Sequence, residues 1–387
     1  MALFGAWTPA SIAAPPKPPS SLSAASWILV DPASGDVLAA QDDKTAYPIA
    51  SATKLMTYYV AAEQLRPARE VVAAPYDPEP GESLAGFEPG DSLTARDVFY
   101  GLMVPSGNDA ALTLALAVSG SESDFVSRMN AAADDLGLAE TDYLDPIGLS
   151  PGNVSSARDL VGIATELREQ RLFREIVDTR RITLRSGPEP IRIENRNALV
   201  LEEPFIDGIK TGTTLEAGYV LVASGARRGV ELISVVLGAP DEGSRDAATL
   251  ELFDYGFSLY RKRTLVERGE RVGFVPLAEG GRLPLDAAAD LEGVARAGQE
   301  VEVKLQEGPP VSGPLAVGDP VGVAQVSVDG RKVGEVDALA AQAVTGLLAA
   351  EPDDDGEIPA SVWVIAGIAV LLSAILALTA VGVHRRE

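Results

Sequence analysis

The chain has 387 residues, of which 46% are apolar, and it carries a formal charge of −24, no cysteine and a single histidine. This length and apolar content predict a buried core and two domains plus additional segments, and the acidic balance argues against nucleic acid as a partner. The missing cysteine excludes disulfides and thiolate chemistry, and His384 near the C-terminus leaves no histidine for a Ser-His-Asp triad. We therefore expect no metal and no other cofactor, and a reactive serine here needs a base other than histidine.

Residues 1–20 are predicted to be a signal-like or disordered segment. Leu3 to Ala14 is apolar and rich in small residues, and a Pro-rich stretch follows it. No Lys or Arg precedes the apolar run, although export signals normally begin with positive charge. A degenerate signal and a misplaced start both explain this pattern, and the sequence leaves the choice open.

Residues 21–260 predict a catalytic domain of the α+β class. The alternating runs Ala25–Val30 and Asp36–Ala40 predict a β-hairpin. Helical patterns follow at Ser51–Leu65, Thr94–Met103, Asp109–Val118, Glu122–Leu136 and Ala157–Arg168, and strands return at Gly208–Thr213, Gly218–Ser224 and Val230–Gly238. Strands at both ends with helices between them predict one antiparallel sheet, with packed helices and a helical lobe, whose strands lie far apart in sequence.

The rest of the chain predicts a second domain and a membrane anchor. Residues 261–340 contain short β-prone runs broken by Gly and Pro, which are typical of a small all-β domain, and we expect its role to be mechanical. An acidic linker, residues 341–357, precedes an apolar run, residues 358–383, that is long enough for one transmembrane helix. Basic residues lie in the short tail, 384–387. The positive-inside rule therefore predicts a single-pass protein of the cell membrane, with a cytoplasmic tail and its catalytic domain on the extracellular face.

Three short motifs combine residue types that suit acyl transfer. Among seven lysines, only Lys54 has a serine three residues earlier, giving Ser51-Ala-Thr-Lys54, and only Lys210 is followed by Thr-Gly. Ser106-Gly-Asn108 lies between these two motifs. Each motif alone fits an ordinary helix turn, loop or strand. Together and in this order they nearly match the trio of serine β-lactamases and penicillin-binding proteins.

The spacing of the first motif predicts a lysine beside a serine. Residues three apart share one face of a helix, so Lys54 can act as the base for Ser51, whose hydroxyl is a weak nucleophile by itself. A lysine can do this only when neutral, and burial or a second cation, here Lys210, would lower its pKa from about 10.4. A helix that begins at Ser51 also directs backbone N–H groups toward a developing oxyanion.

The other two motifs predict relay and binding groups. We expect Ser106 to relay a proton between Lys54 and the leaving amine, and Asn108 to recognise a substrate amide. The segment Lys210-Thr-Gly212 has an edge-strand pattern, beside which a substrate peptide can add as a further strand.

Three blocks, Tyr47–Thr57, Leu102–Ala110 and Asp207–Thr214, resemble the active-site blocks of low-molecular-weight penicillin-binding proteins, the serine-type D-alanyl-D-alanine carboxypeptidases. The resemblance covers about residues 25–340, since that family also carries a small C-terminal β-domain and then a membrane anchor. It implies a hydrolase of peptidoglycan biosynthesis that removes the terminal D-alanine from stem pentapeptides through an acyl-enzyme. It also implies that β-lactam antibiotics bind covalently as inhibitors.

The resemblance implies roles for nine residues. Ser51 is the nucleophile, Lys54 its base and Ser106 a further catalytic group. The residues implied to bind substrate are Asn108, Lys210, Thr211, Gly212, Thr213 and Arg245, the last where the family often has an arginine that supports the substrate carboxylate. Backbone N–H groups of Ser51 and Thr213 would form the oxyanion hole. Two departures are Thr213, where relatives often have a bulkier residue, and Asp145, which replaces a more usual asparagine.

Three alternative functions use the same motifs. A D,D-endopeptidase would cut cross-links at the same site. A serine β-lactamase also needs fast deacylation, and no Glu-x-x-Leu-Asn segment of the class A kind is found in the sequence. A β-lactam sensor or a vestigial wall-binding scaffold is the third alternative, but a sensor needs an output module and only residues 384–387 are predicted to lie inside the cell. The sequence favours a carboxypeptidase and leaves the endopeptidase open.

Overall fold

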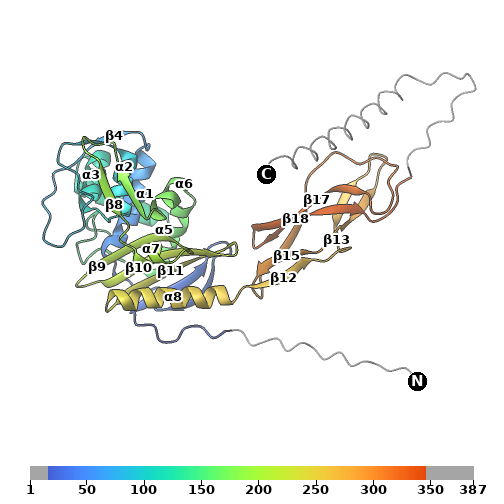
Figure 1. Cartoon of the computed structure of the whole chain (residues 1–387), viewed down its shortest axis with the longest axis horizontal. Coiled ribbons are helices and arrows are strands. Elements are labelled where there is room, and N and C mark those ends of the chain that lie inside the picture. The colour runs from blue at the N-terminus through green and yellow to red at the C-terminus, as the bar shows by residue number, and fades with distance from the viewer. Residues whose placement is uncertain (1–15, 346–387) are drawn as a thin grey trace, which may run out of the picture. The chain divides into compact units, whose positions relative to one another are not determined.

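The computed structural model describes residues 16–345, which form two compact units (Figure 1). The first unit contains the described residues up to Leu265 together with two later segments, Glu292–Glu302 and Ser327–Val333. The second unit contains Val266–Leu291, Val303–Val326 and the described residues from Gly334 onward. The predicted domain boundary at residue 260 stays a prediction. The two later segments make most of their contacts with the first unit and therefore belong to it.

An antiparallel sheet of five strands lies at the centre of the first unit, in the order β2-β1-β11-β10-β9. Its strands are β1 (Ser26–Asp31), β2 (Asp36–Gln41), β9 (Ile206–Thr214), β10 (Gly218–Arg227) and β11 (Val230–Ala239). Ser26 of β1 lies opposite Leu237 of β11, which confirms the predicted sheet built from distant parts of the sequence. β9 is an edge strand, as its pattern predicted, so one of its sides is unpaired within the sheet.

The two faces of the sheet pack against different helices, because successive side chains of a strand point to opposite faces. Ile28 and Val30 of β1 belong to the apolar core that includes the helical lobe. Trp27 and Leu29 belong to a second core with α8 (Glu242–Ser258). Figure 1 shows α8 running along one face of the sheet while the lobe covers the other. No helix was predicted at α8.

The helical lobe is formed by the chain between β2 and β9. Its helices are the 3-10 turn η1 (Ala50–Thr53), α1 (Lys54–Gln64), α2 (Ala95–Met103), α3 (Asn108–Ser119), α4 (Glu122–Asp135), α5 (Ala157–Arg168), α6 (Arg171–Val177) and α7 (Ala198–Glu202). Short two-stranded sheets pair β3 (Tyr47–Pro48) with β6 (Val154–Ser155), β4 (Glu70–Val72) with β5 (Ser92–Thr94), and β7 (Arg181–Leu184) with β8 (Ile191–Glu194). The helix predicted from Ser51 begins as the turn η1, and the α-helix itself starts at Lys54.

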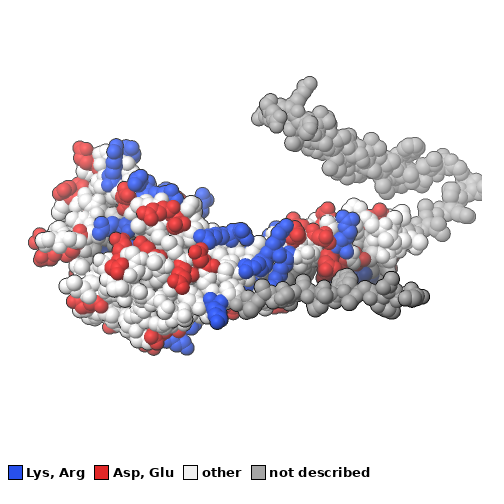
Figure 2. Space-filling view, turned by 60° about the horizontal axis from the view of Figure 1, so that its bottom comes forward, with Lys and Arg blue, Asp and Glu red and all other residues white. Residues whose placement is uncertain are grey.

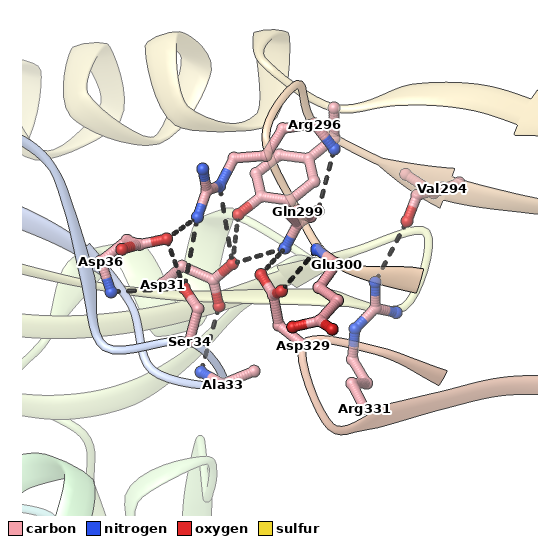
Figure 3. A network of polar contacts seen from close by, with 11 residues as sticks. Asp31, Ala33, Ser34, Asp36, Val294, Arg296, Gln299, Glu300, Asp329 and Arg331 are labelled. Carbon is pink, nitrogen blue, oxygen red and sulfur yellow. Dashed lines mark hydrogen bonds and ion pairs between the residues drawn. The ribbon is translucent and has the colours of Figure 1, made fainter. Parts of the chain in front are cut away.

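A polar network holds the two later segments of the first unit against the β1–β2 hairpin (Figure 3). Asp31, which is 3% exposed, accepts a hydrogen bond from Gln299 Nε2 at 3.3 Å. Gln299 Nε2 also donates to Asp329 Oδ2 at 2.9 Å, and Arg296 forms an ion pair with Asp36. Both segments are therefore anchored to the first strands of the chain.

The strands after α8 confirm the predicted all-β character of the C-terminal part. β12 (Arg261–Val266) pairs with β15 (Leu291–Ala295), and a five-stranded sheet has the order β13-β14-β18-β17-β16. The strands of this sheet are β13 (Arg271–Pro276), β14 (Arg282–Ala287), β16 (Val301–Leu305), β17 (Pro320–Val328) and β18 (Arg331–Ala340).

The surface carries charged side chains of both signs, and Figure 2 shows them interspersed on the face it presents. Within residues 16–345, no helix is both long enough and apolar enough to cross a membrane. The predicted transmembrane run, residues 358–383, and most of the predicted signal-like segment lie outside the described residues.

Candidate active site

Ser51 and Lys54 lie side by side at the start of α1. Ser51 belongs to η1, and Lys54 is the first residue of α1, with a side chain that is 0% exposed. Lys54 Nζ lies 3.0 Å from Ser51 Oγ, 2.8 Å from Asn108 Oδ1 and 2.7 Å from the carbonyl oxygen of Ile147. An ammonium can donate to all three oxygens. A neutral amine keeps two donors for the amide and the carbonyl, and its lone pair then faces the serine hydroxyl.

Burial lowers the pKa of Lys54 to about 7. The carboxylates of Asp145, Asp109 and Glu82 act in the opposite direction, because they favour the ammonium form. The sequence suggested both burial and Lys210 as causes of a lowered pKa, and burial is the one that lowers it here. Near neutral pH, Lys54 therefore populates both charge states, which suits a general base.

Lys210 of β9 is the second buried lysine of the site, at 1% exposure. Its Nζ donates to Ser106 Oγ at 2.8 Å and to the Thr211 carbonyl at 2.7 Å. Burial lowers the pKa of Lys210 well below its ordinary value, and nearby positive charges, first that of Lys54, lower it further. The turn Ser106-Gly-Asn108 thus links the two lysines, since its serine contacts one and its asparagine the other.

Two residues of the site have left-handed backbone conformations that are uncommon outside glycine. Ser106 has a φ of 65° and Ala50, which precedes Ser51, has a φ of 47°. Such conformations cost energy and concentrate at functional sites, where the surrounding structure maintains them.

The edge strand β9 passes close to the turn that carries Ser51. A Cβ atom at Gly212 would lie 2.9 Å from Ser51 N and 3.0 Å from Ile49 O, so the approach requires glycine. Thr211 is 9% exposed, whereas Thr213 is exposed and donates from Oγ1 to the Gly212 carbonyl at 2.8 Å. The contact brings the backbone of β9 alongside that of Ser51.

One open cleft of about 1290 Å³ collects the candidate residues. Its lining includes Ser51, Ser106, Asn108, Thr211, Gly212, Thr213 and Arg245. Lys54 and Lys210 reach this lining from buried positions, so all nine candidates meet at one site. Arg245 extends from α8, is 2% exposed, and pairs with Asp246 at 2.8 Å and Glu242 at 3.0 Å. In residues 16–345 no group of His, Cys, Asp or Glu side chains is arranged to hold a metal ion.

Asp145 shapes the site in a way that the sequence did not predict. Its Oδ1 accepts hydrogen bonds from the backbone N–H of Ile147 at 2.7 Å and Gly148 at 2.5 Å, and its Oδ2 accepts from Ser150 N–H at 2.7 Å. These bonds fix the loop that presents the Ile147 carbonyl to Lys54. The sequence identified Asp145 only as a departure from the family's usual residue.

Glu82 is the second carboxylate that the sequence did not assign. It lines the cleft, and its Oε2 accepts a hydrogen bond from Asn108 Nδ2 at 2.8 Å. Glu82 lies in a Pro-Gly-Glu-Ser stretch without a catalytic motif, so no signal in the sequence pointed to this contact.

Comparisons with known proteins agree over most of the chain. Residues 11–241 match the family model described as D-alanyl-D-alanine carboxypeptidase, and residues 260–346 match that of the penicillin-binding protein 5 C-terminal domain. The D-alanyl-D-alanine carboxypeptidase DacF of Bacillus subtilis is 30% identical over 326 residues, which covers 81% of this chain and 83% of that protein. DacB2 of Mycobacterium tuberculosis, named as the same enzyme, is 37% identical over 244 residues, 61% of this chain and 83% of that protein.

Two solved structures extend the comparison. Penicillin binding protein 5 from Haemophilus influenzae matches with a TM-score of 0.59 and 28% identity, covering 85% of this chain and 100% of that one. The Streptomyces K15 DD-transpeptidase matches with a TM-score of 0.58 and 29% identity, covering 63% of this chain and 100% of that one.

Proposed function

We propose, for a chain that belongs to the D-alanyl-D-alanine carboxypeptidase family, that Ser51 is the nucleophile with which it cleaves its substrate. The protein is a serine-type D-alanyl-D-alanine carboxypeptidase, and its family acts on peptidoglycan peptides and binds β-lactams. The observation that carries the assignment of Ser51 is the 3.0 Å contact between its Oγ and Lys54 Nζ, in surroundings that lower the pKa of this lysine to about 7.

Acylation would begin with proton transfer from Ser51 Oγ to neutral Lys54. The oxygen attacks the carbonyl carbon of the penultimate D-alanine, and a C–O bond forms while the carbonyl oxygen becomes an oxyanion. Backbone N–H groups of Ser51 and Thr213 would stabilise that charge. The C–N bond then breaks, and the terminal D-alanine leaves after its nitrogen receives the proton, which passes from Lys54 through Ser106.

Deacylation would use the same base again. Lys54, neutral again, accepts a proton from water, and the resulting hydroxide attacks the acyl carbon. The ester C–O bond breaks, Ser51 recovers its proton, and the peptide leaves one D-alanine shorter. A β-lactam would follow the first half of this sequence and then remain bound as an ester of Ser51.

Recognition of the substrate's terminal carboxylate would rest on the β9 side of the cleft. Thr211 and Thr213, which line the cleft, would donate hydrogen bonds to it, and Lys210 would support this side of the cleft through its bonds to Ser106 Oγ and the Thr211 carbonyl. Gly212 allows the peptide close to β9, whose free edge suits pairing with an added strand. Arg245 is already held by two carboxylates, so we assign it a supporting electrostatic role in the lining of the cleft.

We further propose that residues 358–383 anchor the protein in the cell membrane, with the catalytic unit outside. The support is the uncharged run of 26 residues and the basic tail that follows it. The full chain should then sediment with membranes and require detergent for release, while a chain ending at Glu357 should be soluble. Release of the full chain by high salt alone would contradict an integral anchor.

The catalytic proposal is tested with the full chain in detergent and a diacetylated Lys-D-Ala-D-Ala peptide. We expect stoichiometric release of D-alanine from the free acid, and much slower release of D-alanine amide from the C-terminal amide, which lacks the carboxylate. Release that is unchanged in the Ser51→Ala variant would refute the assignment of the nucleophile.

A further inference from the structure

We propose that Glu82 is a positioning residue that holds the Asn108 amide in the one orientation that leaves the Lys54 lone pair free for Ser51. The inference deepens the proposed function and rests on it. Glu82 lies outside all three sequence motifs, and the hydrogen bonds that connect it with Lys54 pass through the amide of Asn108.

A continuous chain of hydrogen bonds connects Glu82 with the nucleophile. The carboxylate accepts from Tyr76 Oη and, at 2.8 Å, from Asn108 Nδ2, both through Oε2. Asn108 Oδ1 then accepts from Lys54 Nζ at 2.8 Å, and Lys54 Nζ contacts Ser51 Oγ at 3.0 Å.

The orientation of the Asn108 amide decides what Lys54 can do. With Oδ1 toward Lys54, the amide accepts one N–H of the neutral amine and the Ile147 carbonyl accepts the other, so the lone pair faces Ser51. With the amide rotated by 180°, Nδ2 would donate to the amine lone pair and compete with the serine hydroxyl. An asparagine alone does not choose between these orientations, because its two ends have similar size.

An ionised carboxylate makes the choice, because it only accepts hydrogen bonds. Burial works against ionisation of Glu82, but hydrogen bonds from Tyr76, Asn108 and the Glu79 N–H, together with the charge of Lys54, hold the pKa of Glu82 below its usual range. The pKa of Tyr76 is raised, first by burial and then by its bond to Glu82, so its phenol stays a donor. Rotation of the amide would place Asn108 Oδ1 against the carboxylate, with both atoms acceptors.

The segment around Glu82 is fixed to the start of α3. Asn108 N–H donates to the Ser83 carbonyl at 2.8 Å, and the Asp109 carboxylate accepts the backbone N–H groups of Ala85 and Gly86, each at 2.8 Å. Glu82 Oε1 also accepts a bond from within its own turn, from Glu79 N–H at 3.2 Å. The carboxylate is therefore held in place beside Asn108 by the same helix end that carries the amide.

The charge of Glu82 has a second, separable effect on Lys54. The charged groups that act on this lysine are the carboxylates of Asp145, Asp109 and Glu82, which raise its pKa against the effect of burial. Lys210 on β9 is itself buried, and its own pKa lies well below the ordinary value. Removing one carboxylate charge makes the ammonium less favourable. The pH at which Lys54 loses its proton should therefore fall in a variant without that charge.

The test is the second-order rate of acylation by a fluorescent penicillin, measured from pH 5 to pH 9 with the full chain in detergent. In Glu82→Gln we expect the high-pH plateau to fall about tenfold, because the amide of Asn108 is no longer held in one orientation, and the acidic limb to move to lower pH. In Glu82→Asp, which keeps the charge with a shorter reach, we expect a reduced plateau with the limb at its wild-type pH.

Glu88→Gln is the matched control, because it removes the charge of an exposed carboxylate in the same segment. Its high-pH acylation rate and the pH of its acidic limb should both stay at wild-type values. If Glu82 had a purely structural role, the high-pH acylation rate would fall equally in Glu82→Gln and Glu82→Asp, and the acidic limb of the pH profile would not move. That result would overturn the inference. A wild-type pH profile in Glu82→Gln would also overturn it. If Glu82→Gln does not fold, a shifted limb in Glu82→Asp would overturn it. Absence of acylation in the wild-type protein would instead refute the proposed function.

Discussion

Among residues 16–345, polar side chains are buried in the first of the two units and not in the second. In the first unit, buried polar and charged side chains include the site residues Lys54, Ser106, Asn108 and Lys210. Among the described residues of the second unit, every buried side chain is apolar, as at Leu285 and Ala338. Charged residues of the second unit lie at its surface instead.

The burial of polar side chains in the first unit indicates that this unit carries the reactive site. A buried ammonium destabilises a fold unless hydrogen bonds compensate its lost hydration. The first unit provides three oxygen partners for Lys54 and two for Lys210, and Ser51, Asn108 and Ser106 of the proposed site are among these partners. The second unit follows the simpler rule of an apolar core and a charged surface. Substitutions of site residues in the first unit should therefore reduce activity, whereas core substitutions in the second unit should reduce stability and leave activity unchanged.

The largest effect should come from the nucleophile. Ser51→Ala removes the attacking oxygen and should lower kcat/KM for D-alanine release by at least ~10⁴-fold, because no later step can proceed. The matched control is Ser312→Ala, an exposed serine of the second unit, which should retain wild-type rates. Steady-state D-alanine release measures both. Comparable activity in the two variants would contradict the placement of the reactive site in the first unit.

Loss of the base should come next. Lys54→Ala leaves Ser51 without a proton acceptor and should slow both acylation and peptide hydrolysis by about 10³-fold. Lys262→Ala, which removes a lysine that is 68% exposed, is the control and should leave both rates unchanged. Stopped-flow acylation by a chromogenic β-lactam reports the step directly. Near-normal acylation in Lys54→Ala would assign the base to another group.

A core substitution in the second unit should affect stability without affecting chemistry. Leu285 is 0% exposed, and Leu285→Ala should reduce the free energy of unfolding of this unit by about 2–5 kcal/mol. The kcat of the folded protein should stay at the wild-type value. Thermal denaturation and activity of the same sample give both quantities, and a matching fall in kcat would show that catalysis depends on the second unit.

The pH dependence should be smaller and should reflect the first unit alone. Lys54 acts as a base only when neutral, and its pKa is lowered to about 7. The acylation rate should therefore rise about tenfold per pH unit below pH 7 and level off above it. A lysine with its ordinary pKa would keep the rate rising to about pH 10, and such a profile would contradict the proposed state of Lys54.

The smallest effect is expected at the surface of the second unit. Arg271 pairs with Asp286 at 2.6 Å, with exposed fractions of 46% and 29% for the two side chains. Exposed pairs contribute little, so Arg271→Gln should change the free energy of unfolding by less than about 1 kcal/mol and leave activity unchanged. Denaturant titration measures the first value, and a larger loss would mean that this surface pair stabilises the unit.

Local spacing explains which parts of the site were predictable from the sequence. Ser51 and Lys54 are three residues apart, so their contact follows from helical geometry even though the helix begins later than expected. Lys210 lies beside the same cleft because of the way β9 packs. The sequence predicted this position only through the resemblance of its motifs to those of the family. The predicted antiparallel sheet and the all-β C-terminal part follow from residue patterning, which repeats along each strand.

The parts that could not be predicted depend on contacts between distant loops. Asp145 acts by organising backbone N–H groups of its own loop, and Glu82 acts on Asn108, which is 26 residues further along the chain. Neither contact has a fixed spacing. The helix α8 was missed because its charged and apolar residues do not form a clear stripe, although Asp241 caps it through Ser244 N–H.

Ser51 is proposed to be the residue that substrate and β-lactam acylate. Mass spectrometry of the penicillin-treated protein, after proteolysis, tests it most directly. We predict a single adduct of the mass of the opened β-lactam on the peptide that contains Ser51, and no adduct on this peptide in Ser51→Ala. An adduct on a different residue, or the same labelling in the variant, would contradict the account.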